Sequence, residues 1–117
     1  MESPTTTLKA QTKALCRDIE ELEQKLGAKA IPFDDAERLW SSAHRPRARI
    51  LAETLLSYVP SSDLMVVFQA GKLRVIKSDE LTCIEVPLSE ELASVHLCTV
   101  VKGLRHLTDY LPTETDG

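Results

Sequence analysis

The feature that most constrains this chain is a row of residues near its start, in the segment LKAQTKALCRDIEELEQKL (residues 8–26). Successive members of the row are separated alternately by four and three positions, which places them on one narrow stripe of a helix, in the a and d positions of a heptad. The stripe predicts a helix over about 7–27 that buries one face. Its members are Leu8, Thr12, Leu15, Ile19, Leu22 and Leu26.

Two interpretations of this stripe remain open, because a buried face needs a cover. A helix inside a globular domain usually shows a wider apolar arc than two positions in seven, and the flanks of this stripe are charged. We therefore favour packing against another protein chain, with packing against the rest of this chain as the alternative. The residues expected to bind a partner are Leu8, Leu15, Ile19, Leu22 and Leu26.

The charges beside the stripe indicate which kind of partner would fit it. With Leu15 and Leu22 at position d, Asp18 occupies position g and Glu23 the following position e. These two carboxylates would face each other in a parallel homodimer, and Thr12 would weaken its apolar seam. The pattern favours a different partner chain or an antiparallel arrangement, although a homodimer stays possible.

The remainder of the chain predicts an α+β fold. Proline and acidic residues after Gly27 mark two further helices, and the period then changes to the alternation of strands, as in Leu73 and Val75 between Lys72 and Arg74. We expect N-terminal helices, a three-stranded antiparallel meander with a tight turn at Ala70-Gly71, and a C-terminal helix packed on the sheet. The later elements are expected over about 34–43, 46–59, 64–69, 72–76, 81–86 and 89–112.

The last helix carries the main ambiguity in this assignment. Ser89 is a suitable N-cap, but residues 95–101 (VHLCTVV) also have strand propensity, and Gly103 is unfavourable inside a helix. As a domain division we expect an N-terminal helix in residues 1–30, a globular body in 31–112 and a loose tail in 113–117.

Bulk properties set the class of protein. A chain of 117 residues forms one modest core, and its net charge of −4 makes nucleic acid an improbable main partner. The first residues are polar and no apolar run is long enough to span a membrane. Cys16, Cys83 and Cys98 form no disulfide framework. We therefore expect a soluble protein of a reducing compartment, the cytoplasm or alternatively the nucleus.

A short basic segment, HRPRAR, is the second candidate site. Arg45, Arg47 and Arg49 would suit an anion, an acidic partner or nucleic acid, since guanidinium groups bind phosphate and carboxylate in a bidentate manner. The alternative is a solvated face that pairs with acidic residues elsewhere in the chain, and this interpretation is favoured because no nucleic-acid-binding motif accompanies the segment.

Side chains capable of catalysis are not grouped in this sequence. His96, Cys98 and His106 match neither a CxxC nor a helical HxxxH spacing, and paired carboxylates such as Asp34-Asp35 stand where helices begin. We expect no catalytic residue, no metal site and no cofactor.

The first strand offers one more surface. Residues 64–69 are short and apolar with no lysine or proline, so a partner strand, or a second copy of the chain, could pair with this edge unless the fold covers it. The sequence as a whole predicts a non-enzymatic protein-interaction module, a small subunit or adaptor of a larger assembly that docks through its N-terminal helix. The alternative is a nucleic-acid-associated accessory protein that uses HRPRAR.

Overall fold

The computed structural model describes residues 4–58, 64–69, 71–77, 83–109 and 111. The expected α+β class is confirmed, while the expected tail, 113–117, and Ala70 of the expected turn lie outside the described residues. The elements in chain order are α1 (Pro4–Gly27), α2 (Phe33–Leu39), the π-helix η1 (Trp40–His44), α3 (Arg45–Ser57), β1 (Leu64–Gln69), β2 (Lys72–Lys77), β3 (Cys83–Pro87), the 3-10 helix η3 (Leu92–Ser94) and α4 (Leu97–Asp109).

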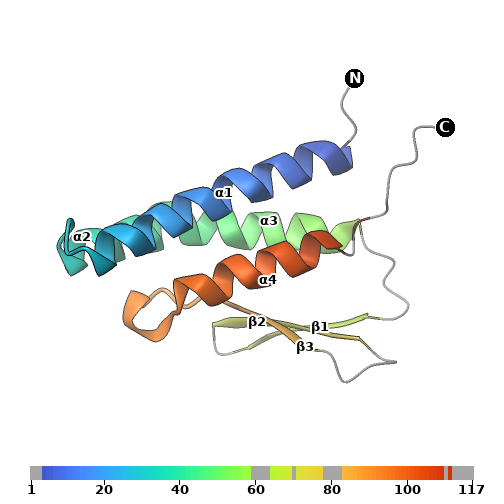
Figure 1. Cartoon of the computed structure of the whole chain (residues 1–117). Coiled ribbons are helices and arrows are strands. Elements are labelled where there is room, and N and C mark those ends of the chain that lie inside the picture. The colour runs from blue at the N-terminus through green and yellow to red at the C-terminus, as the bar shows by residue number, and fades with distance from the viewer. Residues whose placement is uncertain (1–3, 59–63, 70, 78–82, 110, 112–117) are drawn as a thin grey trace.

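The elements form three layers (Figure 1). The sheet is the first layer, α3 and α4 lie side by side over one of its faces, and α1 lies over α3 and α4 on the side away from the sheet. A single cluster of buried apolar side chains runs through all three layers and includes residues of α1. Among the described residues, no helix combines the length and the apolar character needed to cross a bilayer.

The sheet is the expected antiparallel meander, in the order β1-β2-β3. Phe68 pairs with Leu73, and Leu73 pairs with Val86, so alternate side chains of the three strands share one face. We call this the inner face, because its described side chains from β2 and β3 are buried under the helices. Its described apolar members are Val66, Phe68, Leu73, Val75, Ile84 and Val86.

Gly103 allows α4 to approach β3 closely. A Cβ atom built on Gly103 would lie 2.7 Å from Val86 Cγ2 and 3.0 Å from the carbonyl oxygen of Glu85. Because one of these neighbours is backbone, it cannot move aside as the end of a long side chain does. The glycine that the sequence marks as a helix breaker thus remains inside a continuous helix and permits its contact with the sheet.

Gly103→Ala is therefore expected to destabilise the fold. Alanine would add about 1 kcal/mol of helix propensity, but overpacking against a backbone neighbour costs roughly 1–3 kcal/mol. We expect a net loss of up to about 2 kcal/mol in the free energy of unfolding, measured by urea denaturation. Lys102→Ala, at the exposed neighbouring position, is the control and should change this free energy by less than about 0.5 kcal/mol. A Gly103→Ala variant that is more stable than the parent by the full gain in helix propensity, about 1 kcal/mol, would contradict the close approach.

The last helix begins later than the sequence indicates. Ser89 does not cap α4, which starts at Leu97; the Ser89 hydroxyl instead accepts a hydrogen bond from the Glu91 amide at 3.2 Å. Val95 is extended (φ −124°, ψ 130°). The cause is tertiary. The Leu88 amide donates to the carbonyl of Gly71, and the carbonyls of Leu88 and Ser89 accept hydrogen bonds from Arg45 and Trp40, so these backbone groups bond to other elements and not along a helix.

Pro46 lies in the first turn of α3, directly after a local widening of the helix in η1. The Arg45 amide donates to the carbonyl of Trp40, five residues earlier, as in a π-helix. Proline has no amide hydrogen to donate, and its ring crowds the preceding turn, so the wider turn accommodates it. As a result α2, η1 and α3 follow one another without an intervening loop.

Candidate functional site

The heptad stripe of α1 lies in the core of its own chain. Leu8, Leu15, Ile19 and Leu22 are buried, and Leu26 is partly buried against the same cluster. Of the two interpretations left open by the sequence, packing within the chain is the one that the structure shows. A partner would reach these side chains only if α1 separated from α3 and α4.

Polar neighbours explain how so narrow a stripe is covered within one chain. Thr12 is buried, and its hydroxyl donates to the carbonyl of Leu8 at 2.8 Å, so the one polar member of the stripe is satisfied. Next to the stripe, Asp18 pairs with Arg47 at 2.9 Å and Glu20 pairs with Arg105 at 2.7 Å. The charged flanks of α1 therefore meet oppositely charged residues of α3 and α4.

The three arginines of HRPRAR each have an acidic partner within the chain. Arg45 Nε donates to the carbonyl of Leu88 at 2.9 Å, and its guanidinium lies 3.4 Å from Glu90. Arg47 pairs with Asp18, and Arg49 pairs with Glu53 at 3.3 Å. These contacts join α3 to α1 and to the segment before α4. They agree with the interpretation favoured from the sequence, in which the segment pairs with acidic residues of the same chain. No described contact presents the three guanidinium groups as one anion site.

His44 has a buried, unpaired ring nitrogen. Its Nδ1 atom has no hydrogen-bond partner within the described chain. Burial lowers the pKa of His44 from its ordinary value of 6.5, and the nearby Arg47 lowers it further, while Asp18 and Glu21 act in the opposite direction. The folded state therefore favours the neutral imidazole.

This preference predicts a dependence of stability on pH. The unfolded chain binds a proton at His44 as the pH falls through about 6.5, whereas the folded chain resists protonation, so stability present above this pH is lost below it. We expect the free energy of unfolding to fall as the pH is lowered from about 7.5 to about 5.5. The fall should be smaller in the His44→Gln variant, because the carboxylates contribute equally in the parent and in the variant. Equal losses in parent and variant, measured by urea denaturation, would show that His44 is not the group responsible.

Of the sulfur and imidazole residues, Cys83 and His106 line one pocket between β3 and α4. Cys16 is buried, and burial raises the pKa of its thiol, which makes it a poor nucleophile. Cys83, His96 and Cys98 are exposed. Among the described residues, no group of three His, Cys, Asp or Glu side chains is arranged to hold a metal ion.

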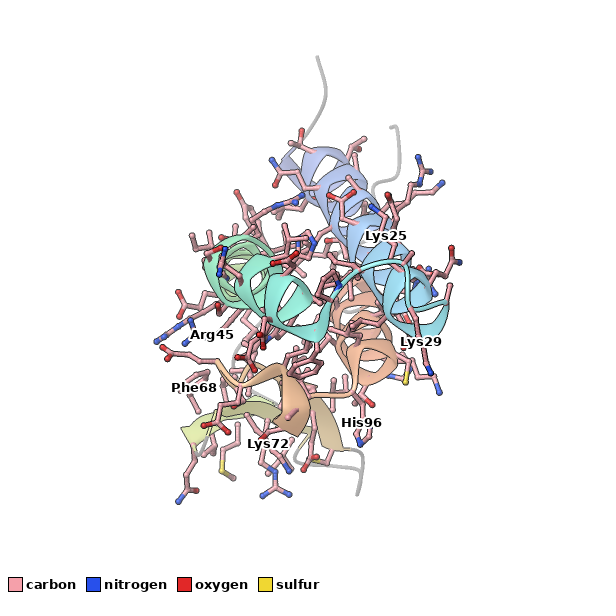
Figure 2. The ribbon with its side chains drawn as sticks, turned by 90° about the vertical axis from the view of Figure 1, so that its left-hand side faces the viewer. Lys25, Lys29, Arg45, Phe68, Lys72 and His96 are labelled. Carbon is pink, nitrogen blue, oxygen red and sulfur yellow. The ribbon has the colours of Figure 1, made fainter. Side chains whose placement is uncertain are left out.

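The clearest unpartnered feature lies at β1. On the inner face, Leu73 and Val75 of β2 are 4% and 1% exposed, whereas Val66 and Phe68 of β1 are 47% and 46% exposed. The helices thus cover β2 and β3 fully but leave half of β1 open. Figure 2 shows Phe68 at the edge of the sheet, on the same side as Arg45 of α3 and opposite His96.

Helix α3 borders this open strip and completes a shallow pocket of about 200 Å³. The Arg49 guanidinium carbon lies 4.7 Å from the centre of the Phe68 ring, within the range of a cation–π contact. We use the name β1 surface for Arg49, Glu53 and Leu56 of α3 together with Val66 and Phe68 of β1, all of which line this pocket.

The backbone of β1 is open at the same place. The Leu88 amide donates to the carbonyl of Gly71 at 2.6 Å, so the polar backbone groups of Gly71 point toward the β3 side. In an antiparallel ladder this direction alternates along the strand, so Arg74 directs its groups to β1 and its partner Val67 directs its own to β2. Val66 and Phe68 therefore direct their N–H and C=O groups outward, toward the edge of the sheet at which no described strand pairs with β1.

Sequence reasoning identified the edge strand but not its combination with α3. In the sequence Arg49 stands out only as part of the basic segment, and Glu53 and Leu56 belong to no motif, because their place in this pocket depends on how α3 lies over the sheet. The helical spacing of Arg49, Glu53 and Leu56 was the one available signal, since steps of four and three place them on one face.

Comparison of the chain with protein-family models, with curated proteins and with solved structures gave no match.

Proposed function

We propose that this chain is a non-enzymatic protein-interaction module, a subunit or adaptor that docks through the β1 surface and the free edge of β1. The supporting observation is the uneven cover of the inner face, which is closed over β2 and β3 and half open over β1. This proposal keeps the class of function expected from the sequence and moves the docking site from α1 to β1.

The β1 surface provides both components of strand recognition. The outward backbone groups of Val66 and Phe68 would hydrogen-bond to an added strand, which is a sequence-independent source of affinity. The half-exposed side chains of these residues, with Leu56 beside them, would supply the apolar contact. Arg49 and Glu53 at the rim would select the partner by charge.

Photo-crosslinking in cells that produce the full chain tests this proposal. Benzoylphenylalanine is placed at Phe68 in one variant and at Phe33 in another. Phe33 is a matched control, because it is a phenylalanine that is 48% exposed and belongs to α2, which lies away from the sheet (Figure 1). We expect discrete protein adducts, identified by mass spectrometry, from position 68 and none of the same adducts from position 33.

The adducts also separate docking from random collision. For this purpose benzoylphenylalanine is placed at Val66 and a second substitution is added. Phe68→Lys should abolish the adducts from position 66, while Phe33→Lys should leave them unchanged. If position 68 yields no protein adduct, or if both positions yield the same adducts, the β1 surface is not a docking site and the proposal fails.

A further inference from the structure

We infer that the occupant of the β1 surface is a second copy of this chain, and that the two β1 strands pair antiparallel across a two-fold axis. The inference rests on the function proposed above, because it names the partner for the same surface. β1 has the sequence LMVVFQ, with neither a charged residue nor a proline, so nothing in the strand opposes pairing with itself.

The register of this pairing follows from the geometry of β1. In a continuous antiparallel sheet, residues that exchange hydrogen bonds must both have free backbone groups and must share a face. Val66 and Phe68 satisfy both conditions. Pairing Val66 with Phe68 of the second copy, and Phe68 with Val66, places Val67 opposite itself on the axis. A β-branched side chain then faces an aromatic one, which is a favourable cross-strand pair.

The charges of α3 fit the same register. Arg49 and Glu53 are one helical turn apart, about 6 Å along α3, and Val66 and Phe68 are about 7 Å apart along β1. Arg49 lies over Phe68, and Glu53 lines the same pocket as Val66. Arg49 and Glu53 pair with each other at 3.3 Å within one chain. The register that brings Phe68 opposite Val66 also brings Arg49 opposite Glu53 of the second copy, so the two pairs meet with their charges in complementary order.

The other edge of the sheet indicates that the assembly closes as a dimer. β3 carries Glu85, which pairs with Arg74 at 3.0 Å, and ends at Pro87, which has no amide hydrogen to donate to a further strand. A second copy supplies an uncharged strand together with the same two rim charges in reverse order.

Cysteine crosslinking of the purified full chain tests the register. The exposed thiols are first removed with Cys83→Ser and Cys98→Ser, which leaves the buried Cys16. In this background Val67→Cys is expected to oxidise to a covalent dimer, because the two Cα atoms at a non-hydrogen-bonded pair would lie about 4.5 Å apart. Gln69→Cys is the control, since its two copies would lie roughly 13 Å apart.

A mixed crosslink gives an internal check of the same register. Met65 would lie opposite Gln69 of the second copy, so Met65→Cys mixed with Gln69→Cys is expected to form the heterodimeric disulfide, while neither variant crosslinks alone. All crosslinks are measured under mild oxidation, and circular dichroism establishes that each variant is folded.

A charge exchange tests the contact between α3 helices without any change in β1. Arg49→Glu and Glu53→Arg would each bring like charges together, and each is expected to weaken dimerisation roughly tenfold, measured by light scattering over a range of concentrations. The double variant, Arg49→Glu with Glu53→Arg, should recover most of the loss, because the charges are again complementary.

The possible outcomes are distinct from those for the proposed function. A concentration-dependent dimer that crosslinks at position 67, does not crosslink at 69 and is rescued by the charge exchange supports the inference. A monomer at every concentration, a dimer with equal crosslinking at 67 and 69, or photo-adducts at Phe68 with a different protein alone would each overturn it. The last of these results would leave the proposed docking function intact.

Discussion

Deletion of residues 4–27 is expected to abolish cooperative folding of the remaining chain. The deletion removes the side chains of Leu15, Ile19 and Leu22 from the core and uncovers the sides of α3 and α4 that face α1. Burial of each such side chain contributes about 1.5–3 kcal/mol, and small domains have total stabilities of roughly 5–15 kcal/mol. Circular dichroism and amide NMR dispersion of the truncated chain measure the effect.

A single substitution gives the same test without shortening the chain. Ile19→Asp places a carboxylate at a position that is 0% exposed, and burial of an unpaired charge costs several kcal/mol. Glu23→Asp, on the exposed face of the same helix, is the control and should unfold like the parent. A truncated chain that melts cooperatively would instead show that α1 is dispensable, as expected if its stripe bound another protein.

Replacement of Trp40 by alanine is expected to lower the free energy of unfolding by about 3–5 kcal/mol. Trp40 is 0% exposed and is the largest of the fully buried side chains. Its Nε1 also donates a 2.7 Å hydrogen bond to the carbonyl of Ser89, which ties η1 to the segment between β3 and α4. The loss combines a large cavity with the loss of this bond. Urea denaturation followed by circular dichroism measures it.

Two variants separate the contributions at this position. Trp40→Phe keeps most of the apolar volume but removes the donor, and loss of the hydrogen bond to Ser89 should account for about 1–3 kcal/mol. Phe33→Ala removes an exposed aromatic side chain from the neighbouring α2 and is expected to cost less than about 1 kcal/mol. Comparable losses in Trp40→Ala and Phe33→Ala would contradict the anchoring role of Trp40.

The fold class followed from hydrophobic periodicity, because both a helical stripe and a strand alternation are local patterns. The stripe of α1 shows the limit of that approach. Leu15 and Ile19 would be spaced in the same way whether their cover is another protein or α4, so periodicity indicates that a face is buried but not what buries it. The pairs Asp18–Arg47 and Glu20–Arg105 identify the cover, and they join residues that are distant in the sequence.

The same limit applies to the start of α4 and to the candidate site. Ser89 followed by two glutamates has the local composition of a helix start, but the hydrogen bonds that the carbonyls of Leu88 and Ser89 accept from Arg45 and Trp40 hold this segment in another conformation. The half-open state of Val66 and Phe68 depends on how far α3 reaches over the sheet, which no local pattern encodes. The edge strand itself was recognisable because it lacks charge and proline.

The position of α1 has a consequence for the order in which the chain folds. Cys16 approaches Val101, and Glu20 pairs with Arg105, so contacts between α1 and α4 span 85 residues of sequence. During synthesis the apolar stripe of α1 emerges long before α4, and its cover is incomplete until the ribosome has released α4. Contacts of such separation slow the formation of the native state. The nascent chain therefore carries an exposed apolar helix for most of its synthesis, the kind of segment that chaperones bind.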